Sequence, residues 1–138
     1  MLFRSVLDRK DVDAILITTP DHWHGPMVIE ASGAGKDAYC EKPLTNSIEV
    51  GKKMRQAARR NKRVVQIGLQ QRSWSHFQEN AKRVQDGTIG KVYHAECIYQ
   101  GNYTRLEGEP TAPPADLDWE LFQGPAERRP YTAMRQRS

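Results

Sequence analysis

Short apolar runs alternate with amphipathic segments through the first half of the chain. We expect strands over residues 13–19, 37–41 and 64–68, because each is a short run rich in apolar or β-branched side chains. The first of these runs is typical of a strand buried on both faces, as in a parallel sheet. With helices between the strands, the order β-α-β-α-β suits right-handed parallel crossovers.

Prolines and capping residues predict where the helices begin. Pro26 is placed to be the first residue of a helix, with residues 21–25 forming a loop before it. The next helix is expected to open on a capping box at residues 46–49. Its apolar stripe is expected at Val50, Met54, Ala57 and Ala58.

The pattern changes class between residues 70 and 90. A further helix, capped at Ser75, is expected there. Residues 91–103 then alternate as in a strand of an antiparallel sheet with one covered face. The predicted fold class is therefore α/β: a partial Rossmann-type parallel sheet, its C-terminal half, followed by the start of an α+β domain with a mostly antiparallel sheet.

Composition places the chain among globular proteins. Its 138 residues are 38% hydrophobic and 28% charged, which is ordinary for a soluble domain. No apolar run approaches the roughly 18–20 residues that span a bilayer, so no membrane association is expected. The N-terminus turns polar too early for a signal peptide, and two distant cysteines do not suggest a disulfide framework. We expect a cytoplasmic location, which a leader ahead of Met1 would change.

The net charge of +4 raises the question of an anionic partner. Much of the positive charge falls between residues 52 and 63, around one predicted helix and its end, and the last turn of a helix favours cations in any case. Aromatic side chains are not interleaved there, which argues against a nucleic-acid partner. A groove for an anionic dinucleotide would have the same sign of charge.

Polar side chains follow each of the three predicted strands. Residues 19–24 (Thr-Pro-Asp-His-Trp-His) follow the first, residues 41–43 (Glu-Lys-Pro) the second and residues 68–72 (Gly-Leu-Gln-Gln-Arg) the third. Because parallel strands end at one edge of a sheet, we expect these loops to share a ligand site. Lys42 there would hydrogen-bond a ligand oxygen and favour negative charge on it. The Lys42–Pro43 bond is a candidate cis peptide that aims the lysine inward.

Other interpretations of these residues stay open at this point. Asp21, His22 and His24 are common metal ligands, but His76 and His94 lie in no matching motif, so no metal ligand is assigned. Each loop taken alone is also explained by ordinary turns with solvated polar side chains.

Two further features are assigned structural roles. Residues 33–38 match the pattern G-x-G-x-x-A, yet they follow a helix and precede a strand, the reverse of a phosphate-binding loop. Cys40 is expected to be a small buried strand residue rather than a nucleophile.

Four segments taken together resemble the Gfo/Idh/MocA family of NAD(P)-dependent oxidoreductases: residues 13–24, 39–44, 65–72 and 119–126. Their order and spacing are specific, whereas each segment alone is weak. The resemblance implies a Rossmann domain followed by a domain with a large, mostly antiparallel sheet. It makes residues 1–70 an incomplete dinucleotide-binding domain and residues 71–138 the beginning of a substrate and oligomerisation domain.

The resemblance also implies a cofactor, NAD or NADP, and a sugar or polyol substrate. Lys42 takes the place of the family's catalytic lysine, beside the nicotinamide. The full-length form would be a homo-oligomer, and Asp21 stands where the family commonly has Asn. The implied cofactor contacts are Thr19, Pro20, Asp21, His24, Glu41 and Lys42, with Gln70 and Arg72 lining the cleft.

Two parts of the family pattern are not found in these 138 residues: the Gly-rich phosphate loop and a later His-containing motif. We therefore expect an internal fragment of a longer enzyme, with weak or no cofactor binding and no turnover by itself. The alternatives are a non-catalytic remnant that acts through oligomerisation, an NAD-dependent glycoside hydrolase of the same family, and a metal-dependent hydrolase. These residues specify neither the substrate nor the choice between NAD and NADP.

Overall fold

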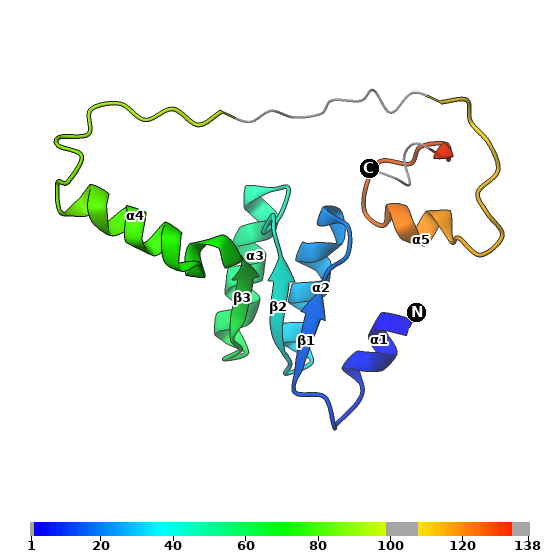
Figure 1. The fold of residues 1–138 in the computed structure, drawn as a ribbon. Coiled ribbons are helices and arrows are strands. Elements are labelled where there is room, and N and C mark those ends of the chain that lie inside the picture. The colour runs from blue at the N-terminus through cyan, green and yellow to red at the C-terminus, as the bar shows by residue number, and fades with distance from the viewer. Residues whose placement is uncertain (1, 99–107, 134–138) are drawn as a thin grey trace. The chain divides into compact units, whose positions relative to one another are not determined.

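A computed structural model of the chain describes residues 2–98 and 108–133. The chain divides into two compact units, residues 1–72 and 73–138. The first unit holds α1 (Leu2–Leu7), β1 (Ala14–Ile17), α2 (Asp21–Gly33), β2 (Asp37–Glu41), α3 (Ile48–Arg60), β3 (Val65–Gly68) and most of the 3₁₀ helix η1 (Gln70–Ser73) (Figure 1). The second unit holds α4 (Ser75–Gln85) and α5 (Trp119–Gln123).

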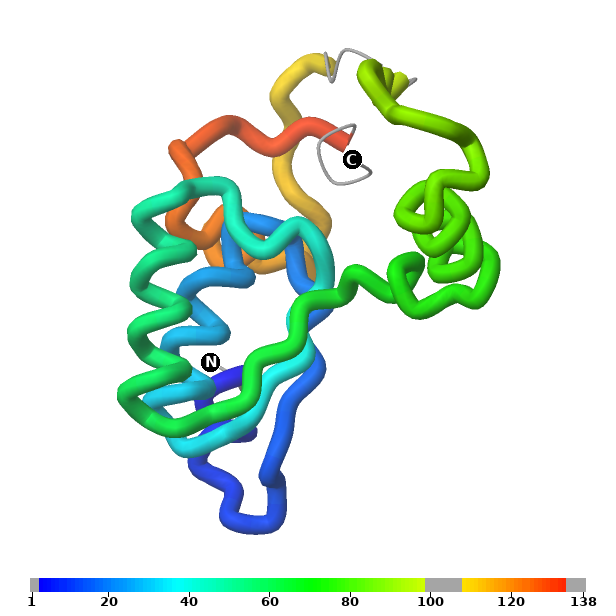
Figure 2. Tube along the Cα trace, turned by 90° about the vertical axis from the view of Figure 1, so that its left-hand side faces the viewer, coloured from blue at the N-terminus to red at the C-terminus, as the bar shows by residue number. Residues whose placement is uncertain are grey.

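The three strands form a parallel sheet in the order β1-β2-β3, which confirms the predicted Rossmann-type β-α-β-α-β unit. Helices α2 and α3 lie on the same side of this sheet (Figure 2). Between the helices and the strands lies a core of buried apolar side chains: Ile17, Val28, Ala38, Cys40 and Met54. Burial of Cys40 at its centre confirms the structural role predicted for it.

The first strand is not buried on both faces, contrary to the prediction. Successive side chains of a strand point to opposite faces of the sheet. Ile17 faces the helices and is 2% exposed, whereas Leu16 is 68% exposed on the other face. Leu16 lies in register with Tyr39, which pairs in turn with Gln66. An apolar run of four residues therefore predicted the strand correctly but not the covering of its second face.

Helix α2 begins at Asp21, five residues before the predicted start at Pro26. The first four backbone N–H groups of a helix have no carbonyl partner within that helix. The segment 21–25 can therefore become helical at little cost. Pro26 lies inside the helix and removes one backbone hydrogen bond. His24 and Gly25, in the segment that was expected to be a loop, are both buried.

Helix α3 is capped one residue later than the capping box predicts. Ser47 has the extended backbone of an N-cap, and its hydroxyl oxygen accepts a hydrogen bond from Val50 N–H at 3.5 Å. The same hydroxyl donates to Glu49 at 3.0 Å. The predicted stripe is confirmed at Met54 and Ala57, which are buried.

The second unit contains no strand in its described residues. Residues 91–98 have no strand pairing and are exposed throughout, and Tyr93 is 94% exposed. A single strand without a hydrogen-bonded partner is not stable, and alternation alone does not supply the partner. The predicted antiparallel strand is therefore wrong over 91–98, and its remainder, 99–103, lies outside the described residues.

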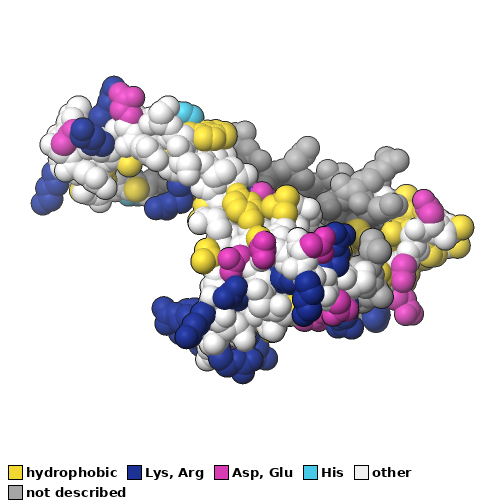
Figure 3. Space-filling view, turned by 90° about the horizontal axis from the view of Figure 1, so that it is seen from below, with side chains coloured by type: hydrophobic (Ala, Val, Ile, Leu, Met, Phe, Trp, Pro, Cys, Tyr) yellow, Lys and Arg dark blue, Asp and Glu magenta, His cyan; other side chains and the backbone are white. Residues whose placement is uncertain are grey.

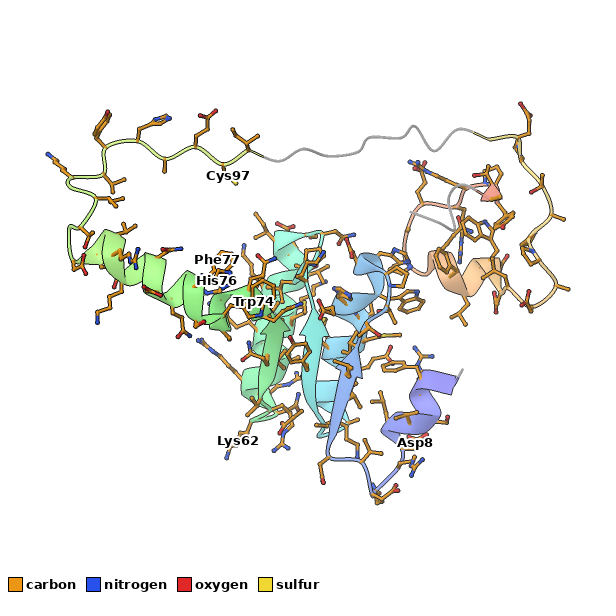
Figure 4. All side chains as sticks on the ribbon, in the orientation of Figure 1. Asp8, Lys62, Trp74, His76, Phe77 and Cys97 are labelled. Carbon is orange, nitrogen blue, oxygen red and sulfur yellow. The ribbon has the colours of Figure 1, made fainter. Side chains whose placement is uncertain are left out.

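Two aromatic clusters organise the second unit locally. At the start of α4, the His76 and Phe77 rings lie 4.8 Å apart and the Trp74 and His76 rings 5.5 Å apart (Figure 4). Trp74, not a capping side chain of Ser75, stands at the N-cap. In α5, the Trp119 ring packs edge-on against Tyr131 at 5.2 Å. None of the helices in the described residues has the length and apolar character needed to cross a membrane.

Candidate functional site

Three loops leave the sheet at one edge, the carboxyl ends of its strands (Figure 1). Because all three strands are parallel, the loops that begin at Thr18, Lys42 and Leu69 start side by side. The last residues of β2 and β3, Glu41 and Gly68, are directly paired. The predicted meeting of the three loops at a shared edge is thus confirmed.

A pocket of about 290 Å³ opens where the second and third loops meet. The side chains of Lys42, Gln70 and Arg72 are exposed and are available to a ligand. The structure therefore brings these three predicted residues together. The pocket is lined by Lys42, Gly68, Leu69, Gln70, Gln71 and Arg72.

The residues of the first loop do not line this pocket. Asp21 is the first residue of α2 and is exposed, as is Pro20. The Thr19 hydroxyl lies 3.6 Å from the Met27 sulfur, so it faces α2, the helix that follows it. Their predicted contacts to a cofactor stay a prediction, since none of these three residues lines the pocket.

The carboxylate of Glu41 is fixed across the end of the sheet. One of its oxygens accepts a hydrogen bond from the backbone N–H of Lys42 at 3.1 Å. The group lies directly over Gly68, where an added β-carbon would be 3.0 Å from that same oxygen. Gly68 therefore leaves the space that the carboxylate occupies. Cys40 directly precedes Glu41 in β2. Burial raises the pKa of the Cys40 thiol to about 11, and the negative charge of Glu41 acts in the same direction.

His24 is buried at the base of the first two loops, with 1% of its surface exposed. Its Nδ1 lies 2.7 Å from the carbonyl oxygen of Pro43, and its Nε2 lies 2.9 Å from that of Thr19. Both ring nitrogens therefore face backbone oxygens. The predicted contact of His24 with a cofactor stays a prediction, and the ring nitrogens are directed at protein oxygens in this structure. The hydrophobic periodicity of the sequence could not predict these contacts of His24, because it places His24 in a loop and gives no partner for a loop residue.

The peptide bond between Lys42 and Pro43 is cis, as the sequence led us to expect. The metal interpretation, in contrast, gains no support. No group of three or more His, Cys, Asp or Glu side chains in residues 2–98 and 108–133 is arranged to hold a metal ion. Its three proposed ligands, Asp21, His22 and His24, all lie on α2, and the His24 nitrogens are turned to the carbonyls of Thr19 and Pro43.

Lys62 and Arg63, which follow α3, lie at the opposite end of the sheet. Figure 3 looks at the end where the strands begin, and Lys and Arg side chains gather there. Lys62, which follows α3, lies at this end in Figure 4. Arg63 is held there by the carbonyl oxygens of Asn61 and Gly35, at 3.0 and 3.1 Å. The positive charge of this segment therefore does not line the pocket at the carboxyl edge.

The donors around the pocket suit the nicotinamide half of a dinucleotide. An ammonium, an amide and a guanidinium meet there, and they can bind the carboxamide, ribose hydroxyls or phosphate of that half. The volume is near the lower limit of small-molecule sites, which run from about 300 Å³ upwards. Residues 2–98 and 108–133 contain no glycine-rich turn between a strand and a helix, the feature that would hold the pyrophosphate.

Comparison with known proteins agrees with this picture. Residues 3–69 match the model of the family described as "Oxidoreductase family, NAD-binding Rossmann fold". This match confirms the resemblance of residues 3–69 to the Gfo/Idh/MocA oxidoreductases, together with the fold class and, at the level of the family, the expected type of cofactor.

Individual relatives are dehydrogenases and a hydrolase. The scyllo-inositol 2-dehydrogenase (NAD(+)) of Bacillus subtilis is 35% identical over 112 residues, which are 81% of this chain and 30% of that protein. A glycosyl hydrolase family 109 protein of Shewanella sp. is 30% identical over 100 residues, 70% of this chain and 21% of that protein. The chain thus spans less than a third of the length of these relatives.

A solved structure supports the same relationship. The 3-ketoreductase of Actinomadura kijaniata, in complex with TDP-benzene and NADP, is 26% identical and superimposes with a TM-score of 0.60. The match covers 64% of this chain and 28% of the reductase.

Proposed function

We propose that this chain carries the nicotinamide side of an NAD(P)-dependent oxidoreductase site that acts on a sugar or polyol. The observation that carries the proposal is the pocket at the carboxyl edge of the parallel sheet, where Lys42 meets the segment 68–72. The family match and the inositol dehydrogenase relative support a small polyhydroxylated substrate.

Lys42 is the proposed catalytic residue. Bound in this pocket, the nicotinamide would accept or give a hydride at its ring carbon. The Lys42 ammonium would donate a hydrogen bond to the substrate oxygen and stabilise the negative charge that forms on it as the hydroxyl proton passes to water. Its side chain is exposed and the residue lines the pocket, while its backbone N–H is held by Glu41 at 3.1 Å.

The other predicted site residues take binding roles in this proposal. Gln70 and Arg72 lie on η1 in the pocket wall and would orient hydroxyls of the cofactor ribose or the substrate. Thr19, Pro20 and Asp21 would contact the cofactor from the first loop. Glu41 acts in this scheme through Lys42, since its carboxylate is directed at the Lys42 backbone.

Separate halves of the cofactor provide the test. The uniformly ¹⁵N-labelled chain is titrated with nicotinamide mononucleotide and, separately, with adenosine monophosphate, while backbone amide shifts are followed. We expect millimolar binding of the nicotinamide half, with shifts centred on residues 42 and 68–72, and weaker effects of the adenine half. Lys42→Ala should abolish those shifts, whereas Lys53→Ala, the same change on the exposed face of α3, should leave them unchanged.

Two outcomes would overturn the proposal. One is a titration in which nicotinamide mononucleotide leaves residues 42 and 68–72 unshifted. The other is equal binding by wild type and Lys42→Ala. Because no glycine-rich phosphate loop occurs in the 138 residues, intact NAD is expected to bind the chain more weakly than micromolar and to support no turnover.

A second candidate function, cleavage of a glycoside with transient oxidation of the sugar, is favoured by the family 109 relative. It uses the same pocket and the same Lys42. The two are distinguished by the products formed when an enzyme with this segment is supplied with NAD and a glycoside. Net reduction of NAD supports the dehydrogenase, whereas release of the free sugar without net reduction supports the hydrolase.

The cellular location and the oligomeric state of the protein are part of the same proposal. We infer a cytoplasmic location and, in the full-length form, a homo-oligomer. Fractionation of the native cells and sedimentation analysis of the purified protein test these two inferences. A monodisperse oligomer that binds neither cofactor half would instead favour the non-catalytic remnant.

A further inference from the structure

We propose that His24 is a positioning residue of this site: its imidazole holds the loop that carries Lys42 against the loop that follows β1. The geometric part of this proposal stands on hydrogen bonds alone. Its consequence for ligand binding rests on the proposed function above.

The contacts of His24 join two loops that are distant in sequence. Thr19 lies five residues before His24, and Pro43 lies 19 residues after it. The ring is 1% exposed, so water does not compete for either contact. An imidazole can span the two carbonyl oxygens because its nitrogens diverge from opposite sides of one rigid ring.

We call the two contacts of the His24 ring the brace, and their hydrogen-bond chemistry explains how they hold the two loops together. A carbonyl oxygen only accepts hydrogen bonds, so each contact requires a proton on the facing ring nitrogen. A neutral imidazole donates to one of the two carbonyls, and an imidazolium donates to both. In either form, removal of the ring nitrogens leaves at least one of these carbonyl oxygens without its donor in a site that excludes water, which is unfavourable.

The position of the brace explains why it acts on Lys42. The carbonyl that Nδ1 contacts belongs to Pro43, the residue directly after Lys42. On the other side, the Lys42 N–H is bound by the carboxylate of Glu41. The backbone of Lys42 is therefore fixed from both flanks, whereas its side chain stays exposed. A catalytic group held in this way loses less freedom when it binds its ligand.

The first test needs no ligand. Backbone order parameters from ¹⁵N relaxation are measured for wild type, His24→Phe, His24→Gln and a control, Val28→Ala. Val28 lies one turn further along α2 and is fully buried, so its truncation weakens the core without touching either loop. We expect the values for Lys42 and Leu44 to fall from near 0.85 towards 0.6 in His24→Phe and to stay unchanged in Val28→Ala.

His24→Gln keeps one donor and should give an intermediate value. It also keeps the test decisive if His24→Phe fails to fold. Equal order parameters at Lys42 and Leu44 in the His24 variants and in Val28→Ala would overturn the brace.

The second test measures the consequence for binding. Nicotinamide mononucleotide should bind His24→Phe about three- to tenfold more weakly than it binds Val28→Ala, the range that loss of one hydrogen bond commonly gives. If the mononucleotide fails to bind wild type, the proposed function falls, while the order parameters still decide the role of His24. If it binds all four proteins equally, His24 does not position this site.

Discussion

The carboxylate of Glu41 rests on Gly68, its partner on the neighbouring strand. A β-carbon on Gly68 would be 3.0 to 3.1 Å from both carboxylate oxygens, closer than ordinary van der Waals contact. The same carboxylate accepts the backbone N–H of Lys42. Gly68, at the end of β3, therefore leaves room for the Glu41 carboxylate of β2, and that carboxylate holds the backbone N–H of Lys42.

This relationship predicts a binding defect with little loss of stability for Gly68→Ala. The Glu41 side chain can rotate away from the new methyl group, so the free energy of unfolding should fall by no more than about 1 kcal/mol. The rotation breaks the bond to Lys42 N–H, and binding of nicotinamide mononucleotide should weaken. Urea unfolding and the amide titration measure the two effects.

Gly33→Ala is the matched control for that substitution. A β-carbon at Gly33 meets no atom within 4 Å, and the residue lies at the end of α2. Alanine there should stabilise the chain by about 0.5–1 kcal/mol or leave it unchanged, without affecting binding. Equal binding by Gly68→Ala and Gly33→Ala would contradict the role assigned to Glu41.

Gly25→Ala should destabilise the first unit strongly. A β-carbon at Gly25 would lie 2.2 Å from Cγ1 of Val50, because α2 and α3 cross closely at this point. We expect a loss of about 1–3 kcal/mol or more in the free energy of unfolding. The double variant Gly25→Ala, Val50→Ala removes the clashing methyl group and should recover part of the loss. Thermal and urea unfolding provide the measurement, and no recovery would place the clash elsewhere.

The two cysteines should differ in reactivity. Cys97 is exposed, whereas Cys40 is buried and its thiol has a pKa of about 11. At pH 8 a thiol reagent should label one cysteine rapidly and the second only after denaturation. In Cys97→Ser the rapid phase should vanish. Rapid labelling that persists in this variant would show that Cys40 is accessible.

The raised pKa of Cys40 also predicts a direction for stability at high pH. The folded chain holds the thiol proton up to about pH 11, whereas the unfolded chain releases it near the ordinary value of 9.0. The folded state then binds more protons, so its stability is complete below pH 9 and declines as the pH rises through 11. Cys40→Ala should remove this contribution from the pH dependence of urea unfolding. If the free energy of unfolding changed equally with pH in wild type and in Cys40→Ala, the contribution assigned to Cys40 would be contradicted.

The attachment of α1 should weaken in acid. Arg4 donates two hydrogen bonds to the Glu30 carboxylate, at 2.9 and 3.0 Å, and thereby lowers the pKa of Glu30. A lowered pKa gives stability that is present above the ordinary value of 4.5 and is lost as the pH falls through the folded value. The pair is partly exposed, so the effect should be below about 1 kcal/mol. Arg4→Ala should lower stability at pH 7 but not at pH 2, and an equal loss at both would contradict the assignment.

Local sequence determined the strands and their shared edge. Short apolar runs, each ended by Pro or Gly, predicted β1, β2 and β3, and parallel pairing then placed Lys42, Gln70 and Arg72 together. These features follow from periodicity and chain direction, which neighbouring residues carry by themselves.

Tertiary structure alone decided the features that depend on distant partners. The sequence could not show that His24 is buried between the carbonyls of Thr19 and Pro43, or that α2 begins at Asp21. Neither could it show that Leu16 is exposed on one face of the sheet, or that residues 91–98 form no strand. A hydrogen bond or a covered face requires a second segment of chain, and only the folded arrangement says whether that segment is present.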